Sequence, residues 1–178
     1  MDFGHRQPHD GDMRPCLLVV HHSPTHTLRA ATDTVLRAAE AAAAEINATL
    51  PAERHLEVRE RDALEPDATE LLGASALLFG TSANFGYISG ALKHYFDSTY
   101  LQVTTDESYT ARAVPFGYWI RGGYDTTGAQ KAMDAITTGY GWTMASSPVC
   151  FTGDPVPHSD DLRALAENTV GAWYAALD

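Results

Sequence analysis

The chain has 178 residues, of which 12 are Lys or Arg and 23 are Asp or Glu, giving a formal net charge of −11. Apolar residues make up 44% of it, which is typical of a globular protein, and this length suits one domain with a single core. A pI near 5.0 argues against a nucleic-acid binder, which needs a basic face for phosphate contacts. The longest unbroken apolar run, residues 16–20, is too short to cross a bilayer, so no membrane partner is expected.

The two cysteines, Cys16 and Cys150, stand outside any CxxC or other metal-ligand spacing. Both lie in apolar runs, where a free thiol packs as a small hydrophobe, so we expect a reduced, cytoplasmic setting. Residues 1–15 are polar and lack the apolar core of a signal peptide. We expect them to form a flexible tail before one domain that covers residues 16–178.

Strand and helix patterns alternate from the start of the domain. Residues 16–20 form a continuous apolar run, typical of a strand buried on both faces. Residues 27–49 carry apolar side chains three and four positions apart, which predicts a long helix. Residues 55–59 alternate in polarity and predict an edge strand, and residues 66–72 fit a short helix.

The second half continues the same alternation. Strands are predicted at residues 74–81, 113–120 and 142–151, and helices at residues 88–99, 126–138 and 162–177. Five strands alternating with five helices predict an α/β fold, in which right-handed crossovers cover both faces of a parallel sheet. Such a sheet binds ligands beyond the carboxyl ends of its strands, at the topological switch point. The loops after the first, third and fourth strands are therefore the candidates for a site.

The loop after the first strand, residues 21–28, opens directly into the long helix. Ser23, Thr25 and Thr27 supply hydroxyls beside the unpaired amides of a helix N-terminus, and a phosphate monoester requires such donors. The alternative is an ordinary N-cap formed by Ser23 or Thr25. The loop matches neither GxGxxG nor GxxxxGK[ST], which argues against a Rossmann dinucleotide site and a P-loop.

The loop after the third strand, residues 80–93, carries Phe85 and Tyr87 on either side of Gly86. Small polar residues surround these aromatics, and this mixture suits the binding of a flat ring. The alternative is a turn-rich loop whose aromatic side chains cover the core.

The loop after the fourth strand, residues 120–128, has two adjacent glycines that let backbone approach a ligand closely. Tyr124 adds a stacking surface, and Arg121 adds a positive charge. The alternative is a plain strand-to-helix connection with Asp125 or Thr126 as the N-cap.

The stretch GTSANFGYISGALKHYFD, residues 80–97, is similar to G-[TS]-P-x-[YN]-x-G-x-[MI]-[PS]-x-x-[LM]-K-x-x-[FLI]-D, a pattern of the flavodoxin-like superfamily. The chain most resembles the FMN-binding NAD(P)H:quinone oxidoreductase and FMN-reductase branches, and the hydroxyl and glycine loops extend the likeness over nearly all of residues 16–178. The resemblance implies a three-layer sandwich whose five-stranded parallel sheet has the order 2-1-3-4-5. It departs from the family in a phosphate loop without glycine and in Ser82, where the family commonly has Pro.

The resemblance also implies FMN as cofactor, NAD(P)H as electron donor, and three groups of cofactor-binding residues. The group around the FMN phosphate is Ser23, Thr25, His26, Thr27 and Leu28. The group along one side of the isoalloxazine ring is Thr81, Ser82, Ala83, Asn84, Phe85 and Gly86. The group at its other edge is Gly122, Gly123, Tyr124 and Asp125, with Arg121 nearby. No side chain is expected to act as a catalytic acid, base or nucleophile, because the flavin carries the chemistry.

Three functions are consistent with the sequence. The first is an FMN-dependent NAD(P)H oxidoreductase that passes electrons to a quinone, a flavin or a similar acceptor. The second is a non-catalytic flavodoxin-like electron carrier, which the charge of −11 favours. The third is a flavodoxin-fold binding module that has lost FMN, which the glycine-free phosphate loop favours.

Two further expectations concern partners and metals. The family favours a homodimer or homotetramer, in which Tyr95, Phe96, Tyr100 and Leu101 form an apolar patch between subunits; alternatively, the loop of residues 102–112 buries them. Histidines at 21, 22 and 26 are not expected to bind a metal, because no carboxylate joins them locally.

Overall fold

The computed structural model of this chain describes residues 14–177. Most of the predicted tail, residues 1–15, lies outside the described residues. At its end, the carbonyl of Pro15 accepts a hydrogen bond of 2.8 Å from the amide of Glu57. No helix within residues 14–177 is long and apolar enough to span a membrane.

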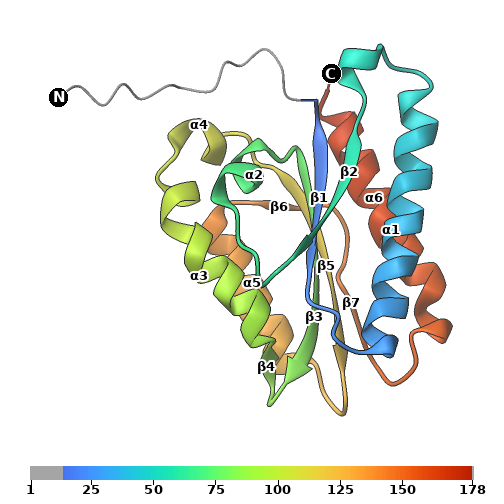
Figure 1. The fold of residues 1–178 in the computed structure, drawn as a ribbon, viewed down its shortest axis with the longest axis vertical. Helices are drawn as coiled ribbons and strands as arrows, with labels where there is room; N and C mark the ends of the chain where they lie inside the picture. Colours follow the sequence, from blue (N-terminus) through green and yellow to red (C-terminus); the bar gives the residue numbers. More distant parts are fainter. Residues whose placement is uncertain (1–13, 178) are drawn as a thin grey trace.

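A parallel sheet runs through the centre of the molecule (Figure 1). Its main strands are β1 (Cys16–His21), β2 (Glu57–Asp62), β3 (Ala76–Asn84), β5 (Pro115–Gly122), β6 (Thr143–Met144) and β7 (Val149–Thr152). The order is β2-β1-β3-β5, with β6 and β7 both paired to β5, while the short β4 (Tyr87–Ile88) pairs antiparallel to the end of β3. Taken together, β6 and β7 occupy the fifth position, so the predicted order 2-1-3-4-5 is confirmed.

Helices cover both faces of the sheet and complete the predicted three layers (Figure 1). On one face lie α1 (His26–Asn47) and α6 (Ser159–Ala175), and on the other lie α2 (Ala68–Gly73), α3 (Gly90–Thr104), α4 (Glu107–Thr110) and α5 (Thr127–Tyr140). Single 3-10 turns occur at Ala52–Arg54 and Val156–His158.

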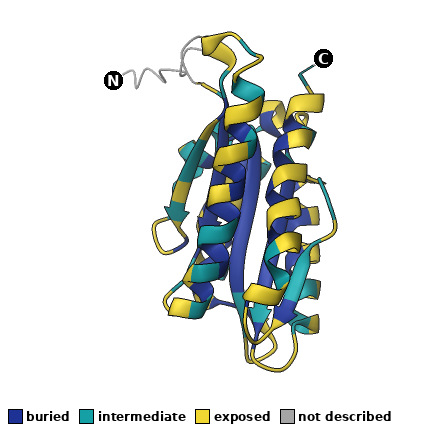
Figure 2. Ribbon diagram, turned by 90° about the vertical axis from the view of Figure 1, so that its right-hand side faces the viewer, coloured by how far each residue is buried: buried dark blue, intermediate teal, exposed yellow. Residues whose placement is uncertain are grey.

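The core consists of two apolar layers, one on each side of the sheet. In β1, Leu17 and Val19 pack toward α1 and α6, whereas Leu18 and Val20 pack toward the helices of the other face. All four side chains are fully buried, because a central parallel strand is covered on both faces. Figure 2 shows this buried sheet between helices whose outer surfaces are exposed.

A close contact between β3 and β5 explains one glycine of the core. Gly80 lies beside Trp119 in the strand register, and a Cβ at Gly80 would lie 2.1 Å from the Trp119 ring. Only a residue without a side chain leaves room for the indole beside the middle of β3. Beyond it, Thr81 is the last buried residue of β3, and Ser82 and Ala83 are partly exposed at the candidate site.

The structure differs from the sequence predictions where elements end, where the last strand is interrupted and where short elements were not predicted. The edge strand predicted at residues 55–59 lies at Glu57–Asp62, and the last strand is interrupted at residues 145–148, where Pro148 supplies no amide hydrogen to a ladder. Within the predicted loop of residues 102–112, the helix α4 forms behind Asp106, whose side chain accepts the amide of Tyr109 at 2.9 Å.

The four residues considered for a subunit patch do not share one environment. Tyr95 and Phe96 are buried in the core, where Phe96 packs against the rings of Phe79 and Tyr140. Tyr100 and Leu101 are exposed. A four-residue surface patch is therefore wrong for this chain, because Tyr95 and Phe96 lie on the face of α3 that packs into the core.

Candidate functional site

Three loops lie together beyond the carboxyl ends of β1, β3 and β5, at the lower end of the molecule in Figure 1. His21 at the end of β1 is level with Gly80 of β3, and Ala83 of β3 is level with Gly122 at the end of β5. The helix after β1 lies on one face and the helix after β3 on the other, so the switch point falls between these two strands. The backbone therefore brings together the loops that carry the predicted site residues.

The loop from β1 to α1 leads into the N-terminus of a long helix. Thr25 is the N-cap of α1, and its Oγ1 accepts the amide of Leu28 at 3.3 Å, so its hydroxyl hydrogen stays free to donate. Among the described residues, the amides of His26 and Thr27 have no intramolecular partner. The first turn of α1 carries no acidic side chain. These donors and the dipole of a 22-residue helix attract a phosphate group.

Ser23 behaves differently from Thr25, because its hydroxyl is held inside the protein. Its Oγ lies 3.0 Å from Nδ1 of His21 and 2.8 Å from Oγ1 of Thr32. The Nε2 atom of the buried His21 lies 2.9 Å from Oε1 of Glu60, which also accepts a hydrogen bond from Arg29. A polar chain thus runs from the candidate phosphate loop to the edge strand β2.

Burial and neighbouring charges have opposite effects on the pKa values of His21 and Glu60, the two groups joined in this hydrogen-bond network. Burial lowers the pKa of His21, against the opposing effect of the Glu60 carboxylate. The hydrogen bond from Arg29 is the largest cause that lowers the pKa of Glu60. The ionised state of Glu60 is therefore favoured in the folded protein, and so is the neutral state of His21.

The glycine-free sequence of the phosphate loop does not strain its backbone. Of the described residues, only Phe85 and Ala113 are non-glycine residues with positive φ, so residues 22–27 all have ordinary backbone angles. The loop follows its path without the conformations that favour glycine.

The turn between β3 and β4 is strained and carries an exposed aromatic ring. Phe85 has φ 51° and Gly86 has φ 76°, between the paired residues Asn84 and Tyr87. This left-handed pair has the form of a type I′ hairpin turn, which usually takes Asn or Gly at its first position. The Phe85 side chain is fully exposed, at 110% of its reference area.

Thr81 lies at the base of this hairpin, but its side chain faces the core and is 1% exposed. Its Oγ1 donates to Ser89 Oγ at 3.1 Å and accepts the Ser89 amide at 3.0 Å. Ser89 in turn caps α3 by accepting the amide of Leu92. Thr81 therefore anchors the start of α3, while Ser82 and Ala83 are partly exposed at the loop.

The loop from β5 to α5 combines tight backbone packing with a second exposed ring. A Cβ at Gly122 would lie 2.8 Å from the carbonyl oxygen of Asp125, whereas Gly123 faces open space. Tyr124 is fully exposed at 102%. The Oδ1 atom of Asp125 accepts the hydroxyl of Thr127 at 2.7 Å and its amide at 3.1 Å, which lowers the pKa of Asp125.

Arg121 is tethered beside this loop, because its Nε donates to the carbonyl of Gly153 at 3.0 Å. The hairpin and the start of α5 are in direct contact, since a Cβ at Gly128 would lie 2.1 Å from the carbonyl oxygen of Gly86. The two loops expected around a flavin ring thus form one packed unit.

Sequence reasoning missed the residues behind the phosphate loop. Thr32 and Glu60 lie 9 and 39 positions from their partners Ser23 and His21, so no local motif connects them. The one available signal is His21 itself, an ionisable residue directly after a buried strand. Across residues 14–177 no cluster of three or more metal-ligating side chains occurs.

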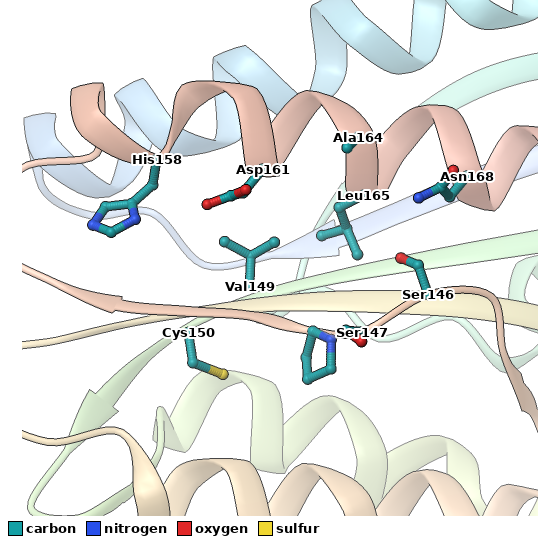
Figure 3. A pocket seen from close by; sticks show the side chains of 10 residues that line it. Ser146, Ser147, Val149, Cys150, His158, Asp161, Ala164, Leu165 and Asn168 are labelled. Carbon is teal, nitrogen blue, oxygen red and sulfur yellow. The ribbon is translucent and has the colours of Figure 1, made fainter.

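Two cavities lie away from these loops. One of about 470 Å³ lies between α6 and residues 146–150, where Val149 points toward the helix and Cys150 points to the opposite face (Figure 3). Another of about 280 Å³ lies between α3 and α5. None of the predicted cofactor-binding residues lines either cavity.

No protein-family model and no curated protein matches the sequence. Solved structures do match. A flavodoxin from the domain Archaea superposes with a TM-score of 0.67 at 13% identity, over 89% of this chain and 99% of that chain. An oxidoreductase from Corynebacterium diphtheriae gives 0.67 at 15% identity, over 91% and 98%.

Rubredoxin oxygen:oxidoreductase from Desulfovibrio gigas gives a TM-score of 0.68 at 13% identity, over 92% of this chain but only 38% of that chain. The chain therefore spans little more than a third of that larger protein. At these identities the comparisons establish the fold alone, and the fold of this chain is flavodoxin-like.

Proposed function

We propose that the protein binds FMN across the three loops and acts as an NAD(P)H oxidoreductase that reduces a quinone, a flavin or a similar small acceptor. Support comes first from the helix end at α1, where two free amides and the hydroxyls of Thr25 and Thr27 are available without a competing acidic side chain. Such a site suits the phosphate group of FMN.

The residues for the ring lie at the neighbouring loops. Phe85 and Tyr124 offer exposed aromatic faces, and Gly123 leaves backbone accessible to the polar edge of a flat heterocycle. Bound FMN would supply the electron transfer, and the protein would orient the ring and leave access for a second substrate.

The strained Phe85 is the observation that carries the proposal. A phenylalanine in the left-handed region costs stability, and a fully exposed ring recovers none of that cost through burial. Residues held in such conformations cluster at functional sites, because the surrounding structure tolerates strain where it serves binding. An aromatic ligand beside the hairpin gives this side chain a role.

The positive charge of Arg121 favours the reductase over the carrier. Its tether to Gly153 holds the guanidinium near Gly122, and a cation beside the ring favours uptake of an electron pair. The overall charge of −11 favours the alternative, a one-electron carrier that docks on basic partners. Consumption of NADH or NADPH by the purified protein with a quinone would distinguish the two.

The test of FMN binding is the visible absorption spectrum of the purified protein, followed by titration with FMN while flavin fluorescence is measured. Thr27→Val removes a loop hydroxyl and should weaken binding about tenfold. Thr34→Val, on the same helix but bonded to the carbonyl of Ala30, is the matched control and should bind normally. A colourless protein that leaves FMN fluorescence unchanged would contradict the proposal and favour a binding module without flavin.

The cellular setting and assembly belong to the same proposal. Burial raises the pKa of both Cys16 and Cys150 to about 11, which keeps the thiols unreactive and is compatible with a cytoplasmic protein. A homodimer or homotetramer would be measured by sedimentation of the purified chain.

A further inference from the structure

The chemistry of Glu60 determines which atom donates in each hydrogen bond of the network that joins Glu60, His21 and Ser23. An ionised carboxylate only accepts hydrogen bonds, so the Nε2 atom of His21, 2.9 Å away, must carry a hydrogen. In a neutral imidazole the other nitrogen, Nδ1, is then an acceptor. The Ser23 hydroxyl, at 3.0 Å, therefore donates its hydrogen to Nδ1.

The remaining contact of Ser23 follows in the same way. Because its one hydrogen is committed to His21, the 2.8 Å contact with Thr32 requires Thr32 to donate to Ser23 Oγ. Ser23 is partly exposed at the loop, but toward a ligand it can present only a lone pair. A phosphate oxygen is also an acceptor, so this arrangement opposes phosphate binding at Ser23.

Protonation of His21 at Nδ1 reverses the hydrogen bond between His21 and Ser23. With a hydrogen on both ring nitrogens, His21 donates to Glu60 through Nε2 and to Ser23 through Nδ1, and the Ser23 hydroxyl hydrogen is released to point outward. The imidazolium would lie one hydrogen bond behind the loop, with its charge balanced by Glu60 on one side and a phosphate dianion on the other.

We propose that His21 is a positioning residue that takes up a proton from solvent when a phosphate group binds the β1–α1 loop, and thereby turns the Ser23 hydroxyl toward the phosphate. This inference rests on the proposed FMN site. The covalent change is one N–H bond formed at Nδ1, and the Ser23 hydrogen moves from an inward to an outward hydrogen bond without leaving its oxygen.

The groups around His21 act on its protonation in both directions. Glu60 and Asp62 of β2 favour the protonated ring, whereas Arg29 of α1, itself paired with Glu60 and Asp33, opposes it. Burial is the largest effect and lowers the pKa of His21 in the free protein. A phosphate dianion bound at the loop adds a further negative charge near the ring, which favours its protonated form.

The test measures FMN affinity between about pH 7 and pH 8.5, where a phosphate monoester with a second pKa of about 6 stays a dianion. We expect affinity to fall as the pH rises, approaching about tenfold per pH unit for one fully coupled proton. Calorimetry in two buffers with different heats of ionisation should show proton uptake. His21→Gln should flatten the profile, and riboflavin, which lacks the phosphate, should give a flat profile with the unmodified protein.

His22→Gln is the matched control. His22 lies on the same loop as Ser23, but its Nδ1 atom lies 3.3 Å from Oδ1 of Asp62 in β2, so this substitution should leave the pH profile unchanged. Nitrogen NMR of the His21 ring in the unsubstituted protein makes the test independent of the variants. The ring should be a neutral Nε2–H form in the free protein and should gain a hydrogen on Nδ1 with FMN.

FMN binding with a flat or rising pH profile, or a ring that stays neutral in the complex, would overturn the inference and leave the proposed function intact. Failure to bind FMN at any pH would overturn the proposed function, and the role of His21 with it.

Discussion

At Phe85, the requirements of folding stability and of the proposed ligand binding oppose each other. Its φ of 51° is a conformation that Asn and Gly adopt at low cost, and its exposed ring makes no burial contribution that would offset the strain. Phe85 is therefore unfavourable for stability, but its exposed ring is available to stack on an aromatic ligand.

Phe85→Asn should raise the free energy of unfolding by about 0.5–1 kcal/mol, because Asn tolerates the left-handed region. The same change should weaken FMN binding, because a stacking face is lost. Urea denaturation and fluorescence titration measure the two effects. Leu64→Asn is the control, since Leu64 is also exposed but has no positive φ, and it should bring neither change.

His21 also makes the stability of the free protein depend on pH. The folded state holds its pKa below the ordinary 6.5, so the unfolded chain binds a proton more readily as the pH falls through this value. The free energy of unfolding should therefore be fully retained above about pH 6.5 and should decrease below it.

Urea denaturation at about pH 7.5 and pH 5.5 measures this loss, and His21→Gln should reduce the difference between the two. Glu60 contributes only at lower pH, because its pKa is lowered from an ordinary 4.5 and its ionised form persists throughout this range. An equal pH dependence in both proteins would show that another group is responsible.

At the scale of elements, the start of α5 positions the hairpin that carries Phe85. The contact depends on Gly128, where a Cβ would overlap the carbonyl oxygen of Gly86 at 2.1 Å. A backbone atom cannot move aside as a flexible side chain can. The two elements that flank the proposed ring site thus share one rigid contact.

Gly128→Ala should destabilise the protein by about 1–3 kcal/mol and weaken FMN binding, because the hairpin must move away from α5. Gly171→Ala on α6 is the matched control: a Cβ there meets no atom within 4 Å, so the helix should gain about 0.5–1 kcal/mol. Thermal denaturation and FMN titration of both variants would separate crowding at the hairpin from the general effect of alanine in a helix.

The elements also show what the sequence pattern can supply. Buried runs such as residues 16–20 predict central strands, because a strand covered on both faces has no polar side. The interruption between β6 and β7 was not predicted. A strand at the edge of a sheet tolerates both polar residues and interruptions, so its sequence pattern does not distinguish a continuous strand from a broken one. Within the site, Ser23 and Thr25 are both hydroxyl residues of one loop, yet only three-dimensional partners at His21 and Thr32 turn the first of them inward.

At the scale of the whole molecule, the net charge of −11 opposes the approach of an anionic ligand. The proposed phosphate site uses amides, hydroxyls and a helix dipole at short range, which salt screens less than long-range repulsion. At the proposed site, local attraction for phosphate would therefore act against a repulsive overall field.

Raising the ionic strength from about 0.01 M to 0.15 M shortens the screening length from about 30 Å to about 8 Å and should strengthen FMN binding roughly two- to fivefold. Riboflavin should show little change. Weaker FMN binding at the higher salt concentration would indicate that ion pairs, and not backbone dipoles, hold the phosphate.

The split outer strand has a consequence for how the protein behaves at high concentration. Unpaired sheet edges recruit strands from other molecules and so promote aggregation. On one side, β6 and β7 offer only two and four residues, separated by a break that contains Pro148. On the other side, β2 carries Glu57, Arg59, Glu60, Arg61 and Asp62, and these charges repel an incoming apolar strand. Both ends of the sheet therefore resist the edge-to-edge growth from which fibrous aggregates form.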